Sequence, residues 1–197
     1  MNRFSADIDV MMKLRLLFSA IALLAVSYIA DAQRFTVSTN VLDYACLGTM
    51  NVEGSYALSR RWSLSAGARY NPFTFRASDP QRQFQIRQIS CSAGVRMWPW
   101  HTSSGWWFAG KARYQEYNYG GITSRATREG DRVGAGLYAG YTHMLGPHFN
   151  LEFGLGAWAG VDWYDIYSCQ VCGLTVDSGN GLFVLPDDIM VAVVYVF

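Results

Sequence analysis

The sequence lacks a strong excess of charge of either sign. Lys and Arg number 16 and Asp and Glu 15, which leaves a net charge of only +1. Binding to a nucleic-acid backbone usually requires a clear basic excess, so we expect no nucleic-acid partner. Histidine and cysteine are also scarce, with 3 and 4 residues. With so few metal-ligating side chains, we predict neither a metal site nor another cofactor.

Long apolar runs are missing after residue 33, so no transmembrane helix is expected there, because such a helix needs about 20 apolar residues. Proline- or serine-rich linkers are missing as well. The part of the chain after residue 32 is therefore predicted to be a single domain.

The first 32 residues have the layout of a secretory signal peptide. Lys13 and Arg15 precede an apolar run over residues 16–29, and the small-x-small pattern of residues 30–32 follows. We predict that residues 1–32 are removed and that 33–197 form the mature domain. Two alternatives stay open, namely translation from Met11 or Met12 and retention of the segment as a membrane anchor.

The sequence is rich in segments in which apolar and polar residues alternate. Apolar residues occupy every second position, with small or polar residues between them, in eight segments: 35–41, 50–58, 62–70, 89–97, 106–114, 133–141, 149–161 and 189–197. A period of two over such lengths predicts β-strands. Segments of about ten residues fit the tilted strands of membrane barrels.

The connections between these segments alternate in length. Short ones lie at residues 59–60, 98–105 and 145–148, and long ones at 71–84, 118–131 and 165–187. Aromatic residues gather at the strand ends, with Trp98 and Trp107 among those near the short connections. Short inner turns, long outer loops and two aromatic girdles are typical of bacterial outer-membrane barrels.

We therefore predict an all-β fold, an eight-stranded antiparallel up-and-down transmembrane β-barrel in the outer membrane of a Gram-negative-type bacterium. The last segment ends on Tyr195 and Phe197, which share one face. Such an ending looks like the assembly signal of outer-membrane barrels, so outer-membrane lipids and the barrel assembly machinery are expected partners. A soluble secreted barrel that holds an apolar ligand, with the two faces exchanged, is the alternative.

Charged residues fall on the polar face of the predicted strands. The set comprises Glu53, Arg69, Arg96, Lys111, Arg113, Glu152 and Asp162. Eight strands enclose little more than side chains, and buried charges are costly unless they are paired. We expect these residues to form a network of ion pairs that fills the lumen, with a narrow pore as the alternative.

Few residues suggest chemistry. Cys169 and Cys172 form a C-x-x-C pair in a predicted outer loop, which favours a disulfide formed in an oxidising compartment. Cys46 could pair with either of them, while Cys91 lies on the apolar face. His101 and Ser103 could serve a lipid-modifying enzyme, but no acid that would orient the His is evident nearby. No catalytic residue is therefore assigned, and the protein is predicted not to be an enzyme.

Four stretches of the chain resemble one family. They are residues 38–44, residues 51–53 leading to 61–63, residues 70–75, and residues 167–173. They look like the Bacteroidota family of small outer-membrane barrels described as a domain of unknown function, whose loci often lie near fimbrillin-type genes. The family more often has Lys where this chain has Ser38.

The resemblance implies a barrel that serves a surface-appendage locus, and it supplies no activity. The predicted function is thus a non-enzymatic outer-membrane barrel with a structural or accessory role at the cell surface, linked to assembly or anchoring of fimbriae. Its contact with an appendage or another envelope protein is expected through the outer loops 71–84, 118–130 and 165–187. A lipid-modifying barrel enzyme and a narrow pore are the alternatives.

Overall fold

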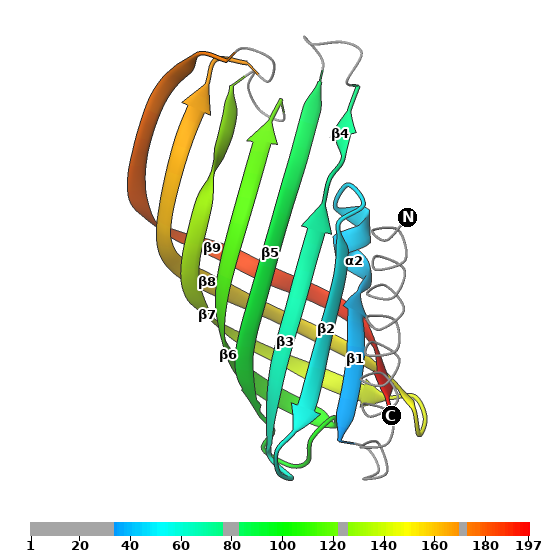
Figure 1. The fold of residues 1–197 in the computed structure, drawn as a ribbon. Helices are drawn as coiled ribbons and strands as arrows, with labels where there is room; N and C mark the ends of the chain where they lie inside the picture. The colour runs from blue at the N-terminus through cyan, green and yellow to red at the C-terminus, as the bar shows by residue number, and fades with distance from the viewer. Residues whose placement is uncertain (1–33, 77–82, 122–125, 170–172) are drawn as a thin grey trace, which may run out of the picture. The chain divides into compact units, whose positions relative to one another are not determined.

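The computed structural model describes residues 34–76, 83–121, 126–169 and 173–197. The predicted signal peptide lies outside these residues. Within them, Phe35–Val196 form one compact unit, a closed barrel of eight antiparallel strands (Figure 1). The predicted fold class is therefore confirmed. Among the described residues, no helix is long and apolar enough to cross a membrane.

The strands follow one another around the barrel as an up-and-down meander, in which β3 pairs with β5 and β9 returns to β1. The two-residue strand β4 extends the β3–β5 hairpin. The elements are β1 (Phe35–Asn40), α2 (Val41–Ala45), β2 (Met50–Ala57), β3 (Trp62–Asn71), β4 (Thr74–Phe75), β5 (Phe84–Met97), β6 (Gly105–Gly120), β7 (Thr127–Met144), β8 (Phe149–Tyr167) and β9 (Thr175–Val196).

Alternation along each strand separates an outer from an inner face. On β6, Trp106 and Phe108 are exposed while Trp107 and Lys111 between and beyond them are buried. The same phase holds on β3, where Leu64 is exposed and Ser65 is buried. Because successive side chains of a strand point to opposite faces, the apolar side chains line the outside, and the inside holds the polar ones together with a smaller apolar and aromatic set.

Of the three long outer loops predicted, 118–131 and 165–187 are wrong, whereas 71–84 coincides with the connection from the end of β3 at Asn71 to the start of β5 at Phe84. β6 continues to Gly120, β7 begins at Thr127, β8 continues to Tyr167, and β9 begins at Thr175. The Gly-, Asn- and Asp-rich composition of these segments suggested turns. In the structure they are held in register by the neighbouring strand, with Asp165 opposite Ser178, and such pairing outweighs weak strand propensity.

The two halves of the barrel consequently differ in height. The strands β1 to β3 have 6, 8 and 10 residues, whereas β5 to β9 have 14, 16, 18, 19 and 22. Figure 1 shows β5 to β9 rising beyond the ends of β1, β2 and β3. We call the residues of β5–β9 that rise above the others the protruding sheet: 84–88, 116–120, 127–131, 163–167 and 175–180.

The connection after β1 also differs from the prediction. Val41 was expected on the first strand, but it begins the short helix α2. Asn40 is the cause, because its side chain accepts a hydrogen bond from the Leu42 amide (3.3 Å), as an N-cap residue does. Its amide group also donates to Asp43 (3.0 Å), and this brings an acidic side chain over the barrel opening.

Aromatic residues form the apolar part of the lumen. Trp98 and Trp107, predicted for an aromatic girdle, are instead only 2% exposed and pack in one cluster with Ala109, Tyr138, Met190 and Ala192. Glycines make the room for them, since a Cβ atom at Gly140 would overlap the Trp107 ring. Large rings inside thus face glycine on the adjacent strands, which sequence alternation alone does not reveal.

Candidate functional site

The lower lumen is built around Arg96, which is 2% exposed. Its guanidinium donates to both carboxylate oxygens of Glu152 (Nη1 to Oε2 3.0 Å, to Oε1 3.2 Å) and forms a second ion pair with Glu53. Lys111 Nζ lies 2.6 Å from the other oxygen of Glu53. Thr142 donates to Glu152 (3.0 Å). Such mutual pairing offsets the cost of burying these charges.

The middle of the lumen is organised by Asp187, near the bulge in β9. Asp187 forms ion pairs with Arg113 and with Arg69, the latter at 3.3 Å. The Tyr138 hydroxyl donates to its second oxygen (2.9 Å). Arg69 also forms an ion pair with Asp43 of α2 (Nε to Oδ2 2.9 Å), which links the helix to the barrel wall.

The upper lumen is organised by Asp162. It lies 2.9 Å from Arg128 and 3.2 Å from Arg132, and the Tyr117 hydroxyl donates to it (2.8 Å). Arg132 also stacks on the Tyr117 ring, 3.9 Å from its centroid. Burial and the hydrogen bond to Asp162 raise the pKa of Tyr117 to about 12, so this phenol stays protonated as the donor of the cluster.

The structure places all seven predicted luminal charges inside the barrel and distributes them over three clusters. It joins Glu53, Arg96, Lys111 and Glu152 in the lower one, Arg69 and Arg113 in the middle one, and Asp162 in the upper one. Sequence reasoning missed Asp43, Arg128, Arg132 and Asp187. All four lie beyond the ends of the predicted strands, although Arg128 and Arg132 keep the inward phase of β7.

The lumen holds little free space. Between the lower and middle clusters lies a cavity of about 30 Å³, bordered by Ser38, Asn51, Glu53 and Arg113 among others. A volume of this size accommodates about one water molecule. Cations also stack on aromatic rings, Arg96 at 4.5 Å from Trp107 and Lys111 at 5.1 Å from Tyr138, so the side chains form a continuous plug.

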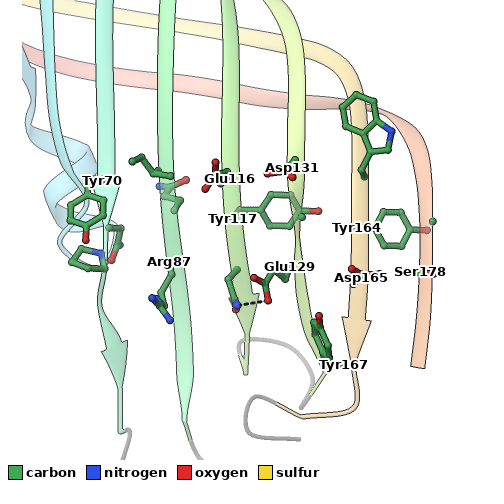
Figure 2. Close-up of a pocket in the computed structure, with 18 residues that line it drawn as sticks. Tyr70, Arg87, Glu116, Tyr117, Glu129, Asp131, Tyr164, Asp165, Tyr167 and Ser178 are labelled. Atoms are coloured by element: carbon green, nitrogen blue, oxygen red, sulfur yellow. Dashed lines mark hydrogen bonds between the residues drawn. The ribbon is translucent and has the colours of Figure 1, made fainter. Parts of the chain in front are cut away.

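A larger hollow lies on the outside, where the outer face turns from apolar to polar. This groove of about 810 Å³ runs across β3 and β5 to β9 (Figure 2). Directly paired residues form its two rows. They are Ile89, Glu116, Asp131 and Trp163 in the first, and Arg87, Asn118, Glu129, Asp165 and Ser178 in the second. We call the first row the rim.

The groove is acidic, with four carboxylates and one guanidinium along its two rows. The Tyr114 hydroxyl lies 3.0 Å from Glu116 and 3.1 Å from Asp131 and can donate to either. Asn118 donates to Glu129 (3.1 Å). Among the described residues, no group of three or more His, Cys, Asp or Glu side chains is arranged to hold a metal ion. The two rows therefore form a polar, acidic belt across the outer face of β5 to β9.

Three of the four cysteines lie within the described residues. Cys169 is disulfide-bonded, Cys46 and Cys91 are free, and Cys172 lies outside the described residues. His101 and Ser103 occupy the β5–β6 turn, where His101 Nδ1 is 3.0 Å from the Thr102 carbonyl oxygen.

At the end of β9, Tyr195 is on the outer face against Phe149, with ring centroids 5.2 Å apart. Phe197 follows β9 and is not part of the barrel unit.

A family model described as protein of unknown function (DUF3575) matches residues 18–197. The chain belongs to this family. The resemblance to a domain of unknown function is thus confirmed, whereas its link to Bacteroidota and to fimbrillin loci stays a prediction. No curated protein and no solved structure matches the chain. For this DUF3575 member, function has to be argued from the barrel itself.

Proposed function

We propose that this DUF3575 protein is a non-enzymatic β-barrel of the outer membrane of a Gram-negative-type bacterium, with a structural or accessory role at the cell surface. One observation carries the proposal, namely an apolar outside combined with a lumen filled by ion pairs. A soluble ligand-binding barrel has the opposite arrangement, with apolar side chains inside. Membrane barrels present an apolar band to lipid and polar side chains to the lumen.

The outer face supports a membrane position in detail. Large apolar side chains are exposed along the strands, among them Leu137 at 79% and Leu155 at 68%. On β6 the outward residues from Trp106 to Tyr114 are apolar or aromatic, and Glu116 at the rim is the first charged one. A run of nine residues on a tilted strand is close to the length needed to cross the hydrocarbon region. The acidic belt would then lie in water just above it.

The filled lumen favours a structural role over conduction. A pore needs a continuous aqueous path, and the buried pairs of Arg96 and Lys111 with their carboxylates occupy that path. The β5–β6 turn likewise gives no support to a lipid-modifying enzyme, because His101 faces a backbone carbonyl rather than a nucleophile. The protruding sheet is the part of the barrel that would meet an appendage or another envelope protein.

The first test is fractionation followed by gel mobility with and without boiling. Closed barrels keep their fold in detergent, so we expect the protein in the outer-membrane fraction with a mobility shift on heating. Recovery as a soluble periplasmic protein without a shift would contradict the proposal and favour a soluble barrel.

Two controls address the alternatives. The purified barrel in a planar bilayer should give no conductance steps, whereas steps that change with Lys111→Glu would support a pore. The lipid A of a deletion strain should have an unchanged mass spectrum, whereas a change restored by the wild type and not by His101→Ala would support an enzyme.

A third experiment tests the accessory role. Partner capture should fail when the protruding sheet is shortened, while the heat shift persists.

A further inference from the structure

The strand β9 has one edge that is only partly used. On one side it pairs with β8 along Thr175–Tyr195. On the other side it pairs with β1, but only from Ala192 to Val196. The Asn40 side chain extends this contact slightly, through the Val191 amide (3.0 Å) and the Ile189 carbonyl (3.4 Å).

From Thr175 to Leu185, no strand among the described residues pairs with this second edge. Figure 1 shows β9 as the outermost strand of the protruding sheet, with β8 as its neighbour. Every second residue of such an edge directs its N–H and C=O groups away from the sheet. We call this stretch the open edge.

The open edge is apolar in its lower half. Leu182 and Val184 point outward and are 88% and 77% exposed. Phe183 points inward, where its ring contacts Trp158 with centroids 4.5 Å apart. The four residues Leu182 to Leu185 are thus a continuous apolar run beside unpaired backbone groups.

Proteins usually protect such an edge with Lys, Pro, a bulge or a covering segment. Here such features stand at the two ends, Pro186 with the register shift opposite Gly154 and Gly156 at the lower end, and a register shift between Thr175 and Asp177 at the upper end. Between them, the sequence from Ser178 to Leu185 contains no charged residue and no Pro. Among the described residues, the edge is therefore unprotected over these eight positions, ending where Pro186 lacks an N–H group.

Both environments favour an additional strand at this edge. In water, Leu182 and Val184 would be exposed beside unpaired backbone, which is the usual condition for strand addition. In the hydrocarbon region, the unpaired N–H and C=O groups would each cost several kcal/mol, and open edges do not occur there. The need for an additional strand consequently does not depend on where the membrane lies.

A second copy of this chain fits the edge poorly. Two-fold antiparallel pairing over the whole stretch would centre on Asn180 and place Leu182 to Leu185 opposite Ser178 to Thr175. Leu182, Phe183 and Leu185 would then face Ser, Asp and Thr across the ladder, and only Val184 would face an apolar residue, which is an unfavourable set of cross-strand pairs. A shifted register that matches the apolar runs leaves only a few pairs.

We propose that the open edge of β9, Thr175–Leu185, takes an extended segment of another protein as an additional strand. The segment would carry apolar residues opposite Leu182 to Leu185 and small or polar residues opposite Asp177 to Gly181. This inference specifies the kind of partner that the accessory role would involve, and in this respect it rests on the proposed function. The strand addition itself requires only the folded barrel.

The test uses the full chain refolded in detergent micelles and a synthetic peptide of ten residues. The peptide has Val and Thr in the half facing Leu182 to Leu185 and Ser and Thr in the other half, and a control peptide of the same sequence is N-methylated at every residue, which blocks both of its edges. Hydrogen exchange read by mass spectrometry on fragments covering 175–185 should slow by about tenfold for the open-edge amides with the first peptide only.

The double variant Leu182→Lys, Val184→Lys places two lysines on the edge, and such charges block strand addition. It should abolish the slowing of exchange by the peptide, while the heat shift of the barrel persists. Equal exchange with both peptides would overturn the proposal. Protection of these amides without peptide, if it increases with protein concentration, would assign the edge to a second copy and would also overturn the proposal. A soluble location of the protein would contradict the membrane proposal and leave this test unaffected.

Discussion

The closed ring and the protruding sheet use the same ion-pair chemistry under different conditions. In the ring, Arg96 and Glu152 each have side chains 3% exposed and are surrounded by paired strands on all sides. Near the tip of the protruding sheet, Arg128 has a side chain 43% exposed. A buried pair becomes costly when one partner is lost, whereas a solvated one contributes little. We therefore expect the lower clusters to contribute more to the stability of the barrel than the upper one.

The largest effect is expected where a charge is removed from the closed ring. Arg96→Leu leaves Glu152 and part of Glu53 without their cation, and such a loss costs about 3–5 kcal/mol. The measurement is the urea midpoint of the refolded barrel in micelles. Arg128→Leu is the matched control and should cost less than about 1 kcal/mol. Equal losses from both variants would show that the two regions do not differ.

The next largest effect concerns the outer face. Leu137→Arg places a charge in the middle of the apolar band and should oppose insertion by about 2–4 kcal/mol. Glu129→Arg, on the second row of the groove, should insert like the wild type. The fraction that reaches the heat-shifted form in lipid vesicles distinguishes them. Unimpaired insertion of Leu137→Arg would argue against the proposed membrane band.

A smaller effect is expected from packing inside the ring. A Cβ atom at Gly156 would overlap the Tyr138 ring, so Gly156→Ala should cost about 1–3 kcal/mol by overpacking. Gly110 on the outer face has no atom within 4 Å of such a Cβ, and Gly110→Ala should change stability by less than about 0.5 kcal/mol. Urea unfolding of the two variants checks this, and similar midpoints would contradict the packing described.

The smallest effect is expected in the upper cluster. Tyr117→Phe removes one donor from Asp162, which keeps Arg128 and Arg132, so the loss should be about 1 kcal/mol. Because the folded state raises the pKa of Tyr117 to about 12, the contribution is complete below pH 10 and disappears as the pH rises through 12. The difference in absorbance at 295 nm between wild type and variant should show one phenol that titrates near pH 12. A step near pH 10 would mean that the hydrogen bond is absent.

Much of the barrel wall could be predicted from the sequence. Positions such as Leu64, Val95 and Phe108 are on the outer face as their alternation indicates, because the two-residue period of a strand acts locally. The ends of the long strands could not be predicted in this way. Residues such as Asp177, Gly179 and Asn180 are poor strand formers by themselves, and only pairing with β8 keeps them extended.

The luminal residues could be predicted from the sequence to a similar extent. Arg96 and Glu152 could be assigned to the inner face from alternation, but nothing local indicates that they meet across 56 positions of the chain. Asp187 was missed because it was placed at the boundary of a predicted loop. The signal that could have found Arg128 and Arg132 is their shared phase with Gly134 and Gly136 on β7.

The sequence by itself determined the strand character of the wall, which residues face outward, and the number of strands, since each follows from a local period. The tertiary structure alone decided the pairing of the luminal charges, the stacking of rings against glycines, the height of the protruding sheet and the open edge of β9. These features depend on how far neighbouring strands are staggered when the sheet closes, and that stagger is set by contacts between distant residues.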